Sequence, residues 1–195
     1  LKTELPQYNT IGKEEIEAAK VVLNSGVLSG FVATSGPQHL GGAHVLALES
    51  AFCDFFGTKF AVSMNSATSC LHAALIAAGI EYGDEVIVPP YSMSASATAV
   101  IMAGGKPVFV DIEPDNFCIR AELVERAISS RTRAIVAVNL FGQPADLFRL
   151  RSIADKNGLT LIEDNAQAPA AKFQTVWTGS IGHMGVFSLN RHKTI

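Results

Sequence analysis

Three short segments of this sequence hold side chains of the kind that perform chemistry, and each follows a run of apolar residues. They are Asn65-Ser66-Ala67-Thr68-Ser69, Glu163-Asp164-Asn165-Ala166-Gln167, and the segment from Gly185 to Lys193, which includes Ser188. In the first segment, small residues and hydroxyl groups open a predicted helix, and the free backbone N–H groups there favour phosphate binding. The same residues also suit an ordinary N-cap made by Asn65 or Ser66.

Asp164 and Gln167 follow the apolar run at residues 159–162. In a parallel sheet, ligands bind beyond the carboxyl ends of the strands, so a strand here would deliver Asp164 into the ligand crevice. A carboxylate in that place could hold a protonated ring nitrogen, with Gln167 near a ring oxygen. The alternatives are that Asp164 caps a helix or pairs with an arginine.

Lys193 is a candidate nucleophile near the end of the chain. A lysine attacks a carbonyl group only when it is neutral, which requires desolvation or a neighbouring cation. Arg191, His192 or a cationic ring bound nearby could supply that charge. The alternative is a solvated surface lysine, which is the commoner situation in proteins.

Taken together, the three segments predict a site for pyridoxal 5'-phosphate. A phosphate cradle, a carboxylate for a pyridinium nitrogen and a lysine that can bind an aldehyde are the parts that this cofactor requires. The common signatures of other enzyme classes are missing, since the sequence has no GxGxxG after a strand, no GxxxxGK[ST], no GxSxG and no HExxH.

Alternating elements are predicted to position these residues. Apolar runs that read as strands occur at residues 60–64, 85–88, 107–110, 134–138, 159–162 and 184–189. Helical patterns occur at residues 13–23, 45–56, 66–78, 95–103, 121–128 and 146–157. Strand–helix repetition with continuously apolar strands predicts an α/β fold, with a mostly parallel central sheet and helices on both faces.

Composition narrows the class of protein further. Fifteen basic and eighteen acidic residues give a net charge of −3, which argues against sequence-independent nucleic-acid binding. The three cysteines are widely spaced, so we expect buried thiols in a reducing compartment and not disulfides or a zinc site. The uncharged stretches at residues 61–80 and 86–105 contain polar residues or prolines, so we expect a cytoplasmic protein without membrane spans.

The sequence resembles the DegT/DnrJ/EryC1/StrS family of pyridoxal-phosphate aminotransferases. Six segments carry the resemblance in order: residues 11–30, 65–92, 104–119, 134–146, 161–168 (LIEDNAQA) and 185–195 (GVFSLNRHKTI). The resemblance implies the large domain of a fold type I transferase at residues 43–195, incomplete at its end. Residues 1–42 would form an N-terminal helix and a substrate-side loop, and a C-terminal small domain is not included.

The resemblance also implies a role for each candidate residue. Lys193 matches the lysine that binds the cofactor aldehyde, Asp164 the carboxylate on the pyridine nitrogen, and Gln167 the amide beside the ring hydroxyl. The phosphate ligands would be Ala67, Thr68 and Ser188, with Ser66 in the same turn. Met93 aligns with the residue that stacks on the ring, where relatives often have an aromatic side chain, and Tyr91 is the alternative. Gly26 and Leu28 fall in the segment that lines the substrate side.

The function implied is transfer of an amino group from glutamate or glutamine to a keto-sugar, nucleotide-linked, or to a keto-cyclitol. Two copies of the chain would form a homodimer with shared active sites. One alternative is a sugar dehydratase of the same fold, whose members carry a histidine in place of the lysine. Another is a non-catalytic regulator that retains the cofactor pocket.

Overall fold

The computed structural model describes residues 11–190 and residue 193, and the chain divides into two compact units between Phe52 and Cys53. The first unit contains helix α1 (Lys13–Ser25), the short 3-10 helix η1 (Pro37–Leu40) and most of α2 (Ala43–Phe56). Helix α1 begins where the Gly12 N–H donates to the Glu15 carboxylate at 2.6 Å. It ends at Gly26, whose φ of 69° is the left-handed conformation that glycine adopts readily.

The second unit is built on a five-stranded parallel sheet. Its strands are β1 (Glu85–Val88), β2 (Lys106–Phe109), β3 (Thr132–Val138), β4 (Thr160–Asp164) and β7 (Met184–Val186). Their order across the sheet is β2-β1-β3-β4-β7, and every neighbouring pair is parallel. All five strands therefore end at one edge of the sheet, and the segments that follow them share that edge.

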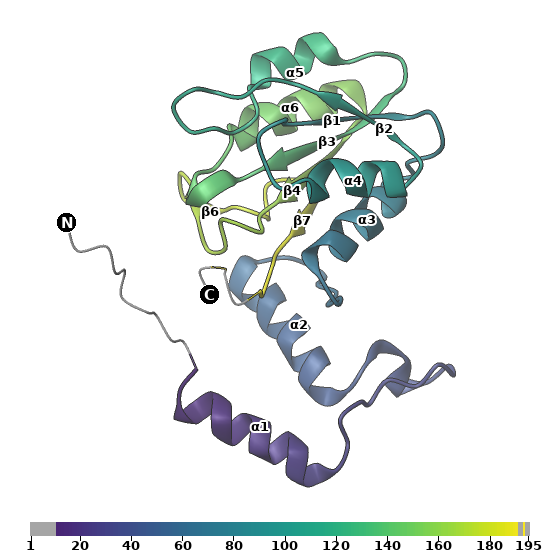
Figure 1. Ribbon diagram of the computed structural model, residues 1–195, viewed down its shortest axis with the longest axis vertical. Coiled ribbons are helices and arrows are strands. Elements are labelled where there is room, and N and C mark those ends of the chain that lie inside the picture. Colours follow the sequence, from purple (N-terminus) through teal and green to yellow (C-terminus); the bar gives the residue numbers. More distant parts are fainter. Residues whose placement is uncertain (1–10, 191–192, 194–195) are drawn as a thin grey trace, which may run out of the picture. The chain divides into compact units, whose positions relative to one another are not determined.

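Helices cover both faces of this sheet. Figure 1 shows α3 (Ala67–Ala77) and α4 (Ala95–Met102) on one face, and α5 (Ala121–Ala127) and α6 (Leu147–Asn157) on the other. Helix α3 packs against α4 and β7, while α6 packs against α5, β3 and β4. The prediction of an α/β fold with a mostly parallel, doubly covered sheet is confirmed.

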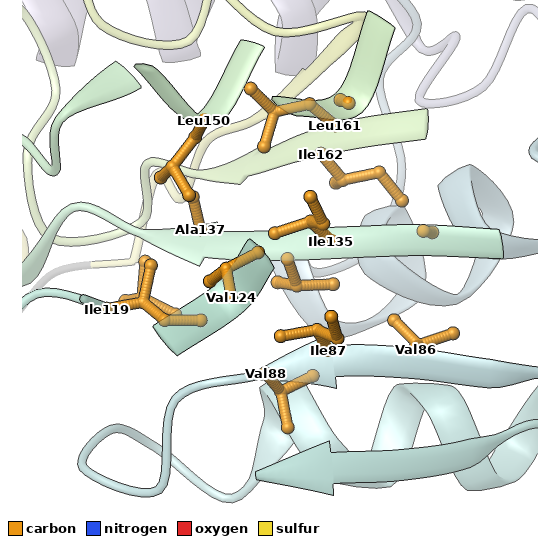
Figure 2. Close-up of a cluster of buried hydrophobic side chains, with 14 of the residues drawn as sticks. Val86, Ile87, Val88, Ile119, Val124, Ile135, Ala137, Leu150, Leu161 and Ile162 are labelled. Atoms are coloured by element: carbon orange, nitrogen blue, oxygen red, sulfur yellow. The ribbon is translucent and has the colours of Figure 1, made fainter. Parts of the chain in front are cut away.

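The core lies between the sheet and its helices. Figure 2 shows Val124 of α5 and Leu150 of α6 beside apolar side chains of β1, β3 and β4, including Ile87 and Ile135. These side chains are all fully buried. Burial of each large aliphatic side chain contributes about 1.5–3 kcal/mol, which explains why both faces of the central strands are apolar.

The predicted strand at residues 60–64 is wrong, because the structure has no strand there. Phe60 and Val62 are each 76% exposed. A strand needs a neighbouring strand for its backbone hydrogen bonds, and neither edge strand of the described sheet, β2 or β7, pairs with this segment. Apolar composition alone was therefore a poor guide to this segment.

The loop predicted after residue 162 instead contains a small antiparallel hairpin, β5 (Lys172–Phe173) and β6 (Val176–Trp177). The three cysteines are free, as predicted; Cys118 is buried, while Cys53 and Cys70 are half-buried. No helix in the described part of the chain is both long enough and apolar enough to cross a membrane.

Candidate active site

Asp164 is the last residue of β4, and its side chain is buried at the carboxyl edge of the sheet. The carboxylate accepts hydrogen bonds from the Ser96 hydroxyl at 2.9 Å and from the Ala166 N–H at 3.2 Å. Burial raises the pKa of Asp164, while these two hydrogen bonds and the charge of Lys193 lower it. A cation next to this desolvated carboxylate would strongly stabilise its ionised form.

Among the described residues, Asp164 neither pairs with an arginine nor caps a helix, the two alternatives to ligand binding. No arginine forms an ion pair with it, since the ion pairs there join other residues. No helix begins at the residues that follow it, so the bond from Ala166 closes a tight turn and caps nothing. Each carboxylate oxygen accepts one hydrogen bond and has the capacity to accept a second from a ligand.

Ser96 is a residue that sequence reasoning missed. It is 1% exposed, lies in the first turn of α4 and donates its hydroxyl to Asp164 at the end of β4. A serine amid the apolar and small residues of a predicted helix is the signal that could have revealed it, because a hydroxyl buried with such residues requires a partner.

The start of α3 shows that the N-cap interpretation of the first segment is correct. Ser66 precedes the helix, and its Oγ accepts a hydrogen bond from the Ser69 N–H at 3.1 Å. Ala67 is the first helical residue, and Thr68 follows with an exposed side chain. An N-cap does not exclude phosphate binding, since other N–H groups of the first turn remain without helical partners.

Gln167 is tied to the segment that follows β3. Its Oε1 accepts a hydrogen bond from the Phe141 N–H at 3.3 Å. Phe141 lies in the short 3-10 helix η2 (Leu140–Gly142) and adopts a left-handed φ of 54°. The other atom of the amide, Nε2, is the donor that could serve a ligand oxygen.

Tyr91 and Met93 both follow β1 but differ in their surroundings. The ring of Tyr91 lies 5.6 Å from that of Phe117 and 6.4 Å from that of Phe141, measured between centroids. Met93 is 69% exposed, and Tyr91 is 49% exposed. Tyr91 is thus held in an aromatic cluster at the sheet edge, whereas the stacking role of Met93 stays a prediction.

Ser188 and Lys193 follow β7, the strand that pairs with β4. Ser188 is buried, and its Oγ accepts a hydrogen bond from the Asn190 N–H at 3.4 Å. Lys193 is half-buried, and its backbone N–H donates to the Asn190 carbonyl at 2.8 Å. It lies close enough to Asp164 for its charge to lower the pKa of that carboxyl.

The predicted substrate-side residues belong to the other compact unit of the chain. Gly26 and Leu28 belong to the first unit, where Gly26 ends α1 and Leu28 is 73% exposed. Arg191 and His192, the other possible sources of positive charge, lie outside the described residues. The substrate-side role of Gly26 and Leu28 stays a prediction.

Comparisons with known proteins match the chain to one family. A sequence profile of the DegT/DnrJ/EryC1/StrS aminotransferase family matches residues 9–195. The L-glutamine:2-deoxy-scyllo-inosose aminotransferase of Streptomyces fradiae is 40% identical over 167 residues, which are 86% of this chain and 39% of that protein. The chain therefore spans well under half the length of this relative.

Solved structures show the same similarity. An aminotransferase from Psychrobacter cryohalolentis is 33% identical and superimposes with a TM-score of 0.88 over 97% of this chain and 46% of its own. The GDP-4-keto-6-deoxy-D-mannose-3-dehydratase of E. coli, solved with bound hydrated pyridoxal phosphate, is 28% identical with a TM-score of 0.81. That alignment covers 92% of this chain and 45% of the dehydratase.

Proposed function

The chain belongs to the DegT/DnrJ/EryC1/StrS aminotransferase family, and we propose that it forms the cofactor-binding part of an enzyme that aminates a keto-cyclitol or a keto-sugar. The amino donor is glutamine or glutamate. The observation that carries this proposal is the buried Asp164 carboxylate at the end of β4, held by Ser96 and close to Lys193. Membership of this family further supports the proposal that the full-length protein is a homodimer with shared active sites.

The residues at this edge fit pyridoxal phosphate. The desolvated Asp164 carboxylate would hold the protonated ring nitrogen, and the free side of the Gln167 amide would donate to the ring hydroxyl. The first turn of α3, from Ser66 to Thr68, would hold the phosphate together with Ser188. Met93 or Tyr91 would lie against the ring.

When bound, the cofactor supplies a ring that accepts the electrons left behind when the donor loses its Cα proton. Asp164 would keep the ring nitrogen protonated, because an ionised carboxylate beside it favours the cationic form. The Lys193 amine would bind the aldehyde and then carry the proton between carbons.

The relative that is 40% identical acts, by its name, on a keto-cyclitol with glutamine as donor, which supports this pair as the first substrates to test. The similarity to a dehydratase keeps dehydration of a keto-sugar as the second candidate. Lys193 favours amination, because the dehydratases that this sequence resembles carry a histidine in its place.

The first experiment tests whether Lys193 binds the cofactor in the full-length protein. Reduction with borohydride after loading with pyridoxal phosphate should attach the cofactor irreversibly to Lys193, as read by peptide mass spectrometry. Lys193→Ala should abolish both the attachment and turnover. Lys156→Ala, at a lysine whose side chain is 73% exposed on α6, should leave both unchanged. Attachment elsewhere, or full turnover by Lys193→Ala, would refute the proposed role.

The second experiment separates amination from dehydration. The protein is incubated with ¹⁵N-labelled glutamine or glutamate and either 2-deoxy-scyllo-inosose or a nucleotide-linked keto-sugar. An aminated product that carries ¹⁵N supports the proposal. A product that has lost an oxygen and gained no nitrogen would establish the dehydratase alternative.

A further inference from the structure

Glu163, the neighbour of Asp164 on β4, is a charged residue completely shut off from solvent. Among the described residues no cation forms an ion pair with it. Four donors surround it instead. Oε1 accepts from the Ile181 N–H at 2.8 Å and the Gly182 N–H at 2.6 Å, and Oε2 from the Gly179 N–H at 2.6 Å and Asn139 Nδ2 at 3.2 Å.

Three of these donors belong to one loop, residues 179–182, which leads directly into β7. Glycine is required where this loop meets β4, since a Cβ at Gly182 would lie 2.9 Å from the Leu161 carbonyl oxygen and 3.2 Å from Glu163 Cγ. A Cβ at Gly185, within β7, would overlap the Gly179 carbonyl. The loop is thus packed closely around the Glu163 carboxylate.

The fourth donor extends the contact to β3. The Asn139 amide also donates to Asn165 Oδ1 at 3.1 Å, and its own Oδ1 accepts from the Ala145 N–H at 2.9 Å. Asn165 Nδ2 in turn donates to the Thr178 carbonyl at 3.2 Å. A continuous network of buried hydrogen bonds therefore joins the ends of β3 and β4 to the loop before β7.

We propose that Glu163 is a positioning residue whose carboxylate fixes the 179–182 loop and, through β7, the place of Ser188 and Lys193 relative to Asp164. The register supports this, because Glu163 pairs with Gly185 and Asp164 with Val186, two residues before Ser188. This inference rests on the proposed function, in which those three residues bind the cofactor.

The arrangement requires a carboxylate and not merely a polar side chain. Four donors are shared between two oxygens that both accept, whereas an amide offers one accepting oxygen and turns an NH₂ group toward at least one N–H. Leaving a buried hydrogen-bonding group unsatisfied costs about 1–3 kcal/mol. The loop would therefore move away from an amide, and the residues carried by β7 would move with it.

The test compares Glu163→Gln with Glu85→Gln in the full-length protein. Glu85 is a matched control, because it is also a buried sheet glutamate, 5% exposed, that accepts from the Ser129 hydroxyl and pairs with Arg131. It lies at the amino end of β1, away from the edge where the site is. Each variant is measured for thermal stability, for pyridoxal-phosphate affinity and for the pH midpoint of the visible band of the bound cofactor.

Both variants should lose stability, but only Glu163→Gln should lower cofactor affinity, by about tenfold or more, and shift the pH midpoint. Equal effects of the two variants on affinity and midpoint, or no effect of Glu163→Gln on either, would overturn the proposal. If wild-type protein binds no pyridoxal phosphate, the proposed function itself fails, which is a distinguishable result.

Gly182→Ala provides a second route if Glu163→Gln does not fold. It displaces the loop from the carboxylate and leaves the charge in place. The pH midpoint of this variant, measured on folded protein, should shift in the same direction as that of Glu163→Gln. An unchanged midpoint would show that the loop does not place the cofactor-binding residues.

Discussion

Ser96 and Asp164 lie 68 residues apart in the chain, yet the Ser96 hydroxyl donates a 2.9 Å hydrogen bond to Asp164 Oδ2 in the buried interior. Helix α4, which follows β1, thereby holds a carboxylate that β4 delivers. The bond lowers the pKa of Asp164 against the larger effect of burial, which raises it. The Ser96 hydroxyl therefore favours the ionised form of Asp164 over the protonated form.

Replacing Ser96 with alanine should raise the pKa of Asp164 further, because one of the interactions that lower it is lost. Ser96→Ala should move the acidic limb of the pH–rate profile of the full-length enzyme to higher pH. An unpaired buried acceptor also costs about 1–3 kcal/mol of stability at neutral pH. Ser96→Thr retains the hydroxyl and serves as the control. An acidic limb that stays in place in Ser96→Ala would show that the bond does not govern the ionisation of Asp164.

Asp164 should make the cofactor-free protein less stable as pH rises. Its pKa is raised in the folded state, mainly by burial, so the folded protein holds this proton more tightly than the unfolded chain. The resulting stability is fully present below the pKa of the unfolded state and is lost as pH rises through the raised pKa.

Asp164→Asn removes this loss while keeping partners for Ser96 and Ala166, since its oxygen accepts from the N–H and its NH₂ can donate to the hydroxyl. In urea unfolding of cofactor-free protein, the variant should gain stability relative to wild type as pH rises from acid to neutral. Parallel curves for the two proteins would contradict the expectation. The same variant should bind pyridoxal phosphate but turn over poorly.

The N-terminus of α3 allows its capping role to be separated from phosphate binding. Ser66→Ala should lose about 0.5–2 kcal/mol of stability, because the Ser69 N–H loses its acceptor. Ser66→Asp restores an acceptor and places a negative charge at the positive end of the helix, so the cofactor-free protein should be at least as stable as wild type. That same charge should repel a phosphate and weaken pyridoxal-phosphate binding about tenfold. Unchanged affinity in Ser66→Asp would place the phosphate elsewhere.

Much of the fold could be predicted because most strands and helices have a recognisable local pattern of apolar residues. The run EVIV at Glu85–Val88 is apolar after its first residue, is buried along its whole length and forms β1 with the expected bounds. Residues 60–64 have a similar apolar pattern but form no strand, since pairing depends on a partner that a local pattern does not reveal.

The candidate site was predictable only in part, for the same reason. Asp164 and Gln167 follow the predicted strand at residues 159–162, so their place at the sheet edge could be inferred. The partners of Asp164 and Glu163 could not be inferred, because Ser96 and the 179–182 loop meet β4 only through tertiary packing. Hydrogen bonds between distant segments leave no periodic signal in the sequence.

Gln167 offers a test of how the amide serves the cofactor. Its Oε1 accepts from the Phe141 N–H at 3.3 Å, and its NH₂ group is the donor proposed for a ring oxygen. Gln167→Glu keeps an acceptor for Phe141 but replaces the donor with a second acceptor that carries negative charge. The fold and stability should change little, whereas cofactor affinity should fall about tenfold and the pH midpoint of the visible band should shift.

Gln167→Ala removes both functions and should also loosen the turn at Phe141, so it serves as the comparison. If Gln167→Glu retains wild-type affinity and midpoint, the amide acts on the Phe141 turn alone, and the ring oxygen must find its donor in another residue.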